Sequence, residues 1–259
     1  MSHLENFAQI VDQAAFNCQE IAQIDSEGKL TLEEAYYIQK LSIGRRLARG
    51  ERQVGFKMGF TSRAKMIQMG LSDVIWGRLT DTMQIEEGSE VEVNRFIHPR
   101  VEPELAFLLK KDLPAQVTNA QALSAVEAIA PALEVIDSRY KDFKFNLPEV
   151  IADNASSSGF VVGSWHSPTI DFSNLGLVMS IDGRPLHVGS TAALLGHPIR
   201  SLVAAARLAA GAGEPLKAGD IILAGGATPA EWIKSGQYIE VEMQYLGRAG
   251  FSLSAQKSA

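Results

Sequence analysis

The chain has 259 residues, of which 46% are apolar and 21% are charged, and its formal net charge is −6. This composition is typical of a globular protein with one large domain or a small domain and a larger one. A pI near 5.4 argues against a nucleic-acid binder, which normally carries a basic face. Cys18 is the only cysteine, which excludes an intramolecular disulfide and a thiolate metal cluster and fits a reducing cytoplasm. The N-terminus lacks the pattern of a signal peptide, and no apolar run approaches the roughly 18 residues of a membrane span, so we expect a cytoplasmic protein without a membrane partner.

Two helices are predicted near the N-terminus. Apolar residues recur at helical spacing from residue 4 to residue 24, which predicts an amphipathic helix. A second helix begins at Thr31, where Glu34 completes a capping box, and Gly50 is a suitable residue to end it. We therefore predict a helical N-terminal subdomain over residues 1–74.

Beyond residue 75, short β-like runs separated by turn residues dominate the chain. Two helices interrupt them. One begins at Thr118, with Gln121 in a capping box, and is expected to stop before Pro131; the other has Pro198 in its first turn and ends at Gly211. This pattern predicts an α+β protein, with a β-rich core over residues 75–259 after the helical part.

The run RVEPELAFLL, residues 100–109, has the apolar content of a buried strand but contains Glu102 and Glu104. Side chains two apart in a strand point to the same face, so both carboxylates lie together, and burying them is costly unless something pairs with them. Glu134 lies in a second apolar run, PALEVIDSRY. Three carboxylates on buried strands favour a hard cation such as Mg²⁺, Mn²⁺ or Ca²⁺. The alternative is that these glutamates face solvent on edge strands, which Pro103 would suit.

Lys57 and the segment ADNASSSG are further candidates. Lys57 lies in QVGFKMGFT between apolar residues and glycines, a setting that can lower a lysine pKa for proton transfer, although a surface lysine at a strand end has the same pattern. Asp153 and Asn154 could cap a turn or bind substrate, and their spacing does not separate the two roles.

Six blocks in order along the chain resemble the 4-oxalocrotonate decarboxylase and 2-oxopent-4-enoate hydratase family, which has the fumarylacetoacetate-hydrolase-like fold. The blocks are KMGFTSRAKMIQMG, RVEPELAF, ALEVIDSRYKDFKF, ADNASSSGFVVG, LLGHP and AGDIILAGG. The resemblance implies a fumarylacetoacetase C-terminal-like mixed β-roll core and a Mg²⁺ or Mn²⁺ ion. It also implies site residues in this chain: metal ligands Glu102, Glu104 and Glu134, the active-site lysine Lys57, and candidate substrate-binding residues Arg139, Asp153, Asn154 and Ser156.

Within the family, the blocks KMGFTSRAKMIQMG and EVIDSRYKDFKFNLPEVIADNASSS look more like the decarboxylase branch than the hydratase branch. The loop GGATPAEW, residues 225–232, departs from the decarboxylase pattern. The implied reaction is decarboxylation of 2-oxo-3-hexenedioate to 2-hydroxypenta-2,4-dienoate in the meta-cleavage pathway of aromatic catabolism. The alternatives are the hydratase, an acylpyruvate-type C–C hydrolase, and a non-catalytic ligand-binding protein, which would not need Lys57.

The family also implies a homo-oligomer and association with the matching hydratase. For Lys57 we expect burial and a nearby dication to lower the pKa, so that a neutral amine takes a proton from substrate C5 and returns one at C3.

Overall fold

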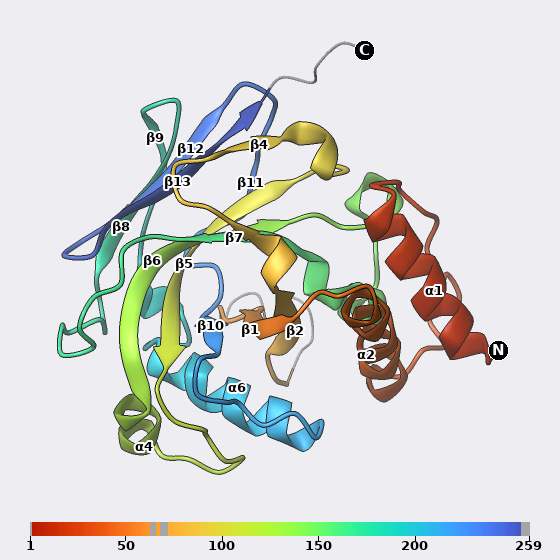
Figure 1. Cartoon of the computed structure of the whole chain (residues 1–259), viewed down its shortest axis with the longest axis horizontal. Helices are drawn as coiled ribbons and strands as arrows, with labels where there is room; N and C mark the ends of the chain where they lie inside the picture. The colour runs from red at the N-terminus through yellow and green to blue at the C-terminus, as the bar shows by residue number, and fades with distance from the viewer. Residues whose placement is uncertain (1, 63–65, 68–71, 255–259) are drawn as a thin grey trace.

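A computed structural model describes residues 2–62, 66–67 and 72–254, so part of the block KMGFTSRAKMIQMG lies outside the described residues. Two sheets form its centre, with α1 and α2 beside the larger sheet and α6 on another side (Figure 1). The helices and strands are α1 (His3–Phe16), α2 (Leu32–Ala48), β1 (Gln53–Gly59), β2 (Ile75–Thr80), β3 (Gln84–Ile85), β4 (Glu90–Glu92), β5 (Arg100–Leu109), α4 (Asn119–Ser124), β6 (Val126–Ile136), α5 (Leu147–Ala152), β7 (Ser157–Val162), β8 (Gly176–Ile181), β9 (Arg184–Ser190), α6 (Ile199–Gly211), β10 (Ile221–Leu223), β11 (Glu231–Trp232), β12 (Tyr238–Met243) and β13 (Gly247–Ser254).

The larger sheet has the strand order β2-β1-β10-β5-β6-β7-β3, with β11 also paired to β5. The smaller sheet has the order β4-β13-β12-β8-β9. Both sheets are mixed, because β1 pairs in parallel with β10, β3 with β7 and β4 with β13, while the other pairs are antiparallel. The predicted α+β architecture with a mixed β core is confirmed.

Alternation along β5 and β6 separates two environments. Odd-numbered residues such as Leu105 and Leu133 belong to the main hydrophobic core, which also contains β8, β12 and β13 side chains of the smaller sheet. Even-numbered residues such as Ala106 and Ala130 face the other side of the larger sheet, in a small cluster with Leu223 of β10. Successive side chains of a strand point to opposite faces, so the even-numbered glutamates must share the second face.

The capping residues predicted for the helices are confirmed. Thr31 and Glu34 form a capping box at α2, and Thr118 and Gln121 form one at α4. Pro198 is the N-cap of α6, which ends at Gly211 as predicted.

The predicted extent of the first helix is wrong. This helix ends at Phe16 rather than residue 24, because Cys18 has a left-handed φ of 49° and Ile21 forms a β-bridge with Tyr140. The helix that begins after Thr118 stops before Pro131 as predicted, and it ends at Ser124 because the chain from Val126 onward pairs with β5. In both places tertiary hydrogen bonding overrides the local helical pattern.

The boundary between residues 74 and 75 stays a prediction. β1 lies on the N-terminal side of this boundary, and it pairs with β2 and β10 in the larger sheet. The described residues contain no helix that is long and apolar enough to cross a membrane.

Candidate metal and active site

The three glutamates predicted as metal ligands come together on the second face of the larger sheet. Glu102 of β5 lies directly opposite Glu134 of β6, and Glu104 follows two residues along β5. One carboxylate oxygen from each residue lies within 4.8 Å of the others. Glu104 and Glu134 are fully buried, while Glu102 is half-buried. The alternative of solvent-facing glutamates on edge strands is therefore wrong.

Pro103 is accommodated inside the sheet by a local gap in strand pairing. Its carbonyl accepts a hydrogen bond from the Ala227 N–H, in the loop between β10 and β11. The N–H and C=O of a residue in an antiparallel strand point to the same side, so the N–H that proline lacks would also face this loop. A proline is therefore tolerated in β5 because no ladder hydrogen bond is lost there.

Lys57 reaches the carboxylates from β1, two strands away. Its Cα pairs with Leu223 of β10, and its side chain is buried on the same face as the glutamates. Lys57 Nζ lies 2.8 Å from Glu134 Oε2 and donates a hydrogen bond of 3.2 Å to the Ala155 carbonyl. The alternative of a surface lysine at a strand end is wrong.

Further donors hold the carboxylates in place. The Gly225 N–H donates to Glu104 Oε2 at 2.6 Å, and the Ser157 hydroxyl donates to Glu134 Oε1 at 2.7 Å. Glu104 Oε1 is buried and has no hydrogen-bond partner among the described residues. A Cβ added at Gly226 would overlap the Glu102 carboxylate, so glycine is needed there for the close approach.

The mutual proximity of these groups shifts their pKa values. Burial and the Glu134 charge raise the pKa of Glu104 well above its usual range, although Lys57 lowers it. Burial also raises the pKa of Glu134, against the lowering effect of Lys57. Burial lowers the pKa of Lys57, but the Glu134, Glu104 and Glu102 charges together raise it above its usual value. The predicted fall in the Lys57 pKa assumed a bound dication and stays a prediction; without the cation, the carboxylates raise this pKa.

The donor set fits a divalent cation. Among the described residues, three carboxylates lie around the Lys57 ammonium group, so negative charge is in excess in the ionised cluster. Glu104 Oε1 has no hydrogen-bond partner among the described residues, so this oxygen is available as a metal ligand. Oxygen-only sites favour Mg²⁺, Mn²⁺ and Ca²⁺ over softer metals.

A cavity of about 80 Å³ opens beside the cluster. Its lining combines apolar side chains with charged groups of the cluster. The lining includes Lys57, Glu102, Ile136, Phe143, Phe145 and Ser156. Such a mixture suits a small acidic molecule held at one end by charge.

Ser156 is the predicted substrate-binding residue that reaches this cavity. Its hydroxyl is buried without a hydrogen-bond partner among the described residues, and its φ of 58° is left-handed. Asn154 and Ala155 are also left-handed, with φ of 51° and 52°. This tight turn presents the Ala155 carbonyl to Lys57 and the Ser157 hydroxyl to Glu134.

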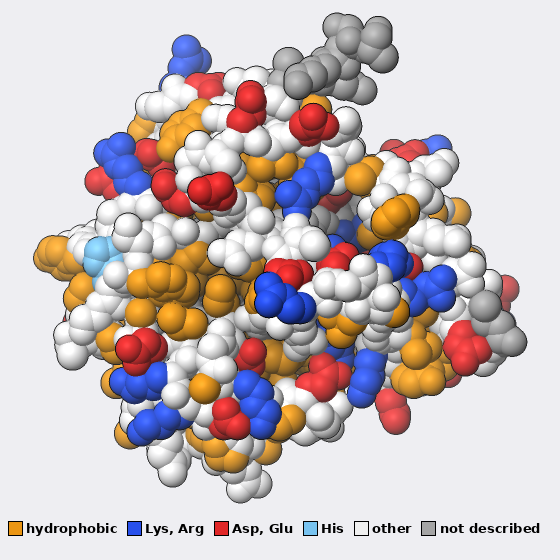
Figure 2. All heavy atoms as spheres, viewed as in Figure 1, with side chains coloured by type: hydrophobic (Ala, Val, Ile, Leu, Met, Phe, Trp, Pro, Cys, Tyr) orange, Lys and Arg blue, Asp and Glu red, His pale blue; other side chains and the backbone are white. Residues whose placement is uncertain are grey.

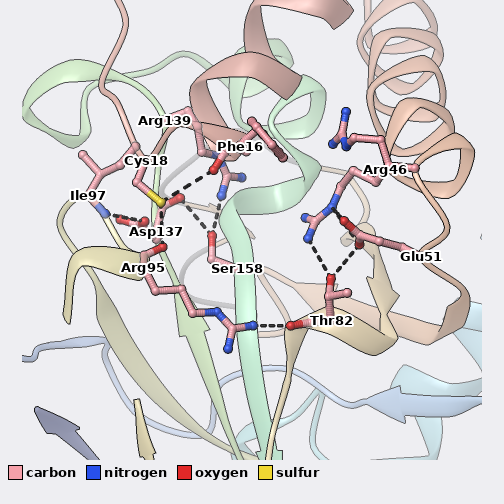
Figure 3. A pocket seen from close by; sticks show the side chains of 12 residues that line it. Phe16, Cys18, Arg46, Glu51, Thr82, Arg95, Ile97, Asp137, Arg139 and Ser158 are labelled. Carbon is pink, nitrogen blue, oxygen red and sulfur yellow. Dashed lines mark hydrogen bonds and ion pairs between the residues drawn. The ribbon is translucent and has the colours of Figure 1, made fainter. Parts of the chain in front are cut away.

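The other predicted substrate-binding residues are engaged in the protein itself. The Asn154 amide exchanges two hydrogen bonds of 2.8 Å with the backbone of Arg78 in β2. Arg139 pairs with the buried Asp153 and, in a second pocket of about 330 Å³, donates to Ser158 (Figure 3). Burial raises the pKa of Asp153 to about 6, against the lowering effect of Arg139. Their role in substrate binding stays a prediction, and their positions favour supporting the turn at 154–156.

Sequence reasoning missed Ser157, the Ala155 carbonyl and the Gly225 N–H. Two of these are backbone groups, which carry no signal in a sequence. The unusual loop GGATPAEW begins at the site, because Gly225 binds Glu104 and Gly226 lines the cavity. On the molecular face drawn in Figure 2, Lys and Arg side chains are interspersed with Asp and Glu.

Comparisons with known proteins agree with this geometry. Residues 52–253 match the model of the fumarylacetoacetate (FAA) hydrolase C-terminal family. The chain is 57% identical to a 4-oxalocrotonate decarboxylase of Pseudomonas sp. over 98% of this chain and 99% of the relative. It is 35% identical to a 2-keto-4-pentenoate hydratase of Paraburkholderia xenovorans LB400, over 94% of this chain and 92% of the relative.

A solved structure gives the same picture. The 4-oxalocrotonate decarboxylase from Pseudomonas putida G7, complexed with magnesium and adipate, superposes with a TM-score of 0.93 at 36% identity. The match covers 96% of this chain and 97% of that chain. The sequence resemblance, the mixed two-sheet core and the buried glutamate cluster thus lead to one conclusion: the chain belongs to the fumarylacetoacetate hydrolase family.

Proposed function

We propose that this protein catalyses the metal-dependent decarboxylation of 4-oxalocrotonate (2-oxo-3-hexenedioate) to 2-hydroxypenta-2,4-dienoate and CO2, in the meta-cleavage pathway of aromatic catabolism. The observation that carries the proposal is the buried cluster of three carboxylates with Lys57 beside it. It occurs in a chain that is 57% identical to a 4-oxalocrotonate decarboxylase along almost its whole length.

Glu102, Glu104 and Glu134 would hold the cation, Mg²⁺ or Mn²⁺. When bound, it supplies a Lewis acid that stabilises negative charge on the keto oxygen of the substrate. The contacts from Gly225 and Ser157 fix two of the carboxylates before the cation arrives. This preorganisation spares the ligands a rearrangement on binding.

The electron balance of the reaction assigns a task to Lys57. The C5–C6 bond breaks, CO2 leaves, and the electron pair shifts through C4 and C3 to the oxygen on C2. That oxygen needs one proton to give 2-hydroxypenta-2,4-dienoate. An ammonium group has three N–H donors; Lys57 donates one to the Ala155 carbonyl and forms an ion pair with Glu134.

The remaining N–H of Lys57 can therefore point into the cavity. We assign it the proton that the C2 oxygen receives, as a general acid. This assignment replaces the expectation of a neutral amine that moves a proton between C5 and C3. A proton transfer from C5 is not needed, because the double bond between C3 and C4 already connects the leaving carboxylate to the keto group.

The apolar wall of the cavity supports this chemistry. Ile136, Phe143 and Phe145 line it together with Lys57 and Glu102. A dry wall lowers the local dielectric and strengthens the interaction between the developing charge and the groups that stabilise it.

The deciding experiment is release of CO2 from 4-oxalocrotonate by the Mg²⁺-loaded protein. We expect turnover that a chelator abolishes and that added Mg²⁺ restores. The proposal fails if no CO2 is released while the protein adds water to 2-hydroxypenta-2,4-dienoate, because that result identifies a hydratase. A hydratase is the second candidate, since relatives of that activity are 35% identical to the chain.

We also propose a homo-oligomer that associates with the cognate 2-oxopent-4-enoate hydratase in the cytoplasm. The support is the family resemblance, together with the reactivity of a dienol product, which would ketonise in water if it were released. Light scattering tests the oligomer, and capture of product in the presence of added hydratase tests the association. A strictly monomeric protein whose product partitions identically with and without hydratase would contradict both.

A further inference from the structure

The second pocket, of about 330 Å³, is separate from the catalytic cavity, and the two share no lining residue. Its volume lies within the range of about 300–1,000 Å³ that is usual for small-molecule sites. Its lining contains six charged side chains: Arg46, Arg49, Arg95, Arg139, Glu51 and Asp137. Cations thus outnumber acids in this lining, although the whole chain has a net charge of −6.

The two acids of the lining already hold hydrogen-bond donors. Both oxygens of Glu51 accept from Arg46 Nε at 3.0 Å, and one of them also accepts from the Thr82 hydroxyl at 2.7 Å. The two oxygens of Asp137 accept from successive backbone N–H groups at 2.8 and 2.7 Å. These carboxylates therefore do not provide a counter-ion for a further cation in the pocket.

Arg95 is the cation of this lining that has no acidic partner among the described residues. The other three arginines each form an ion pair: Arg46 with Glu51, Arg49 with Asp12 and Arg139 with Asp153. The Arg95 guanidinium donates to the Thr82 carbonyl alone among the described groups, so most of its five N–H donors are left over. Burial and the nearby Arg46 charge lower the pKa of Arg95, although Cys18 and Glu51 act in the opposite direction.

Arg95 and Arg46 converge on Thr82 from different segments of the chain. Arg95 donates to the Thr82 carbonyl, and Arg46 donates to the Thr82 hydroxyl at 3.3 Å. In Figure 3 the Arg95 guanidinium extends toward Thr82, whereas the Asp137 carboxylate points to Ile97. Two forked guanidinium groups that meet at one residue suit an anion with several acceptor oxygens.

We propose that this pocket is a second ligand site, which binds a small oxyanion, a phosphate or a carboxylate, between Arg95 and Arg46. The anion supplies the counter-charge that Arg95 lacks and accepts the N–H donors that the protein leaves over. The inference goes beyond the proposed function, because the site shares no lining residue with the catalytic cavity.

The test is calorimetric titration of the full chain with inorganic phosphate and, separately, with acetate, at constant ionic strength and in a chelator. The chelator keeps cations off the glutamate cluster, so no metal can recruit the anion there. We expect one saturable site, and the anion that binds more tightly shows whether the natural ligand is a phosphate or a carboxylate. Arg95→Met should weaken binding of that anion by about 10-fold to 100-fold, the range for lost hydrogen bonds to a charged group.

Matched variants separate anion binding from folding and from diffuse charge attraction. Arg52→Met removes an arginine outside the pocket lining whose side chain is 82% exposed, and it should leave anion affinity unchanged. Arg95→Lys keeps the charge but not the fork, and its affinity should lie between those of wild type and Arg95→Met. Arg46→Lys retains a cation beside Glu51 and should weaken binding by at least threefold. The anion should also raise the Tm of wild type and not that of Arg95→Met.

The proposal is overturned if neither anion binds saturably, or if Arg95→Met binds the preferred anion within threefold of wild type. It is also overturned if Arg52→Met loses as much affinity as Arg95→Met, because that pattern indicates attraction to net charge and not a site. The titration uses no turnover, so its outcome is independent of CO2 release. Failure of the wild type to release CO2 would contradict the proposed function and not the anion site.

Discussion

Replacing Glu104 with glutamine should make the metal-free protein more stable than metal-free wild type. In the presence of Mg²⁺, the variant should be less stable than wild type. Glu104 is fully buried, accepts one hydrogen bond from Gly225, and leaves Oε1 without a partner among the described residues. Glutamine keeps the acceptor for Gly225 and places an N–H₂ group where it can donate to a neighbouring carboxylate. The substitution thus removes a buried like charge and satisfies an orphaned atom.

The size of the effect follows from these two changes. An unsatisfied buried polar group costs about 1–3 kcal/mol, and more when it is charged. For a chain of this length, 1 kcal/mol corresponds to about 2–4 °C in Tm, so Glu104→Gln should melt about 2–12 °C higher in a chelator. With Mg²⁺ at a hundred times its Kd, the free energy of unfolding of the wild type rises by about 2.7 kcal/mol. Most of this increase should be absent in the variant.

The pH dependence has a defined sign. Burial raises the folded-state pKa of Glu104 above its usual 4.5. Above this usual value, the carboxyl ionises more readily in the unfolded chain than in the folded protein, so the free energy of unfolding of the wild type falls as the pH rises. Below this value, the carboxyl is protonated in both states and has no such effect. The advantage of glutamine in the chelator should grow from about pH 5 upward and vanish near pH 4.

The assay is a thermal melt in EDTA and in Mg²⁺ for wild type, Glu104→Gln and Glu149→Gln. Glu149 is an equally buried control whose carboxylate accepts hydrogen bonds from Gln23, Asp25 and Asn146. Its replacement should destabilise the protein in both solutions, with no change in the response to Mg²⁺. The reasoning is refuted if Glu104→Gln melts below wild type in EDTA, or if Mg²⁺ stabilises it as much as wild type.

Three other substitutions test the rest of the site. Lys57→Met should lower turnover by at least about 100-fold with Mg²⁺ affinity retained in calorimetry, and turnover within about tenfold of wild type would contradict the proton-donor role. Gly226→Ala should weaken Mg²⁺ binding because its Cβ overlaps the Glu102 carboxylate, whereas Gly44→Ala, with open space around it in α2, should leave Mg²⁺ binding unchanged. Asn154→Ala should lower the free energy of unfolding by about 1–3 kcal/mol, because two buried hydrogen bonds to the β2 backbone are lost; an unchanged denaturant midpoint would show that this amide does not hold the turn.

The sequence by itself determined those features that depend on neighbours in the chain. Strand alternation fixed Glu102 and Glu104 on one face of β5, and the capping boxes fixed where α2 and α4 begin. These features need only the backbone geometry of a few consecutive residues, which the residue types dictate locally. The six family blocks added the identity of the site, because the residues with chemical roles are quoted in them in order.

Only the tertiary structure decided how distant segments meet. The register of β5 and β6 sets Glu134 opposite Glu102, and a shift of one residue would have turned Glu134 into the apolar core. The pairing of β1 with β10 brings Lys57 within 2.8 Å of Glu134, where burial lowers its pKa but the charges of three nearby carboxylates raise it in the metal-free protein. The same long-range packing joins Arg139 to Asp153 and packs Arg100 against Phe143 and Trp232. Such contacts are set by the packing of whole sheets, and no pattern of neighbouring residues encodes them.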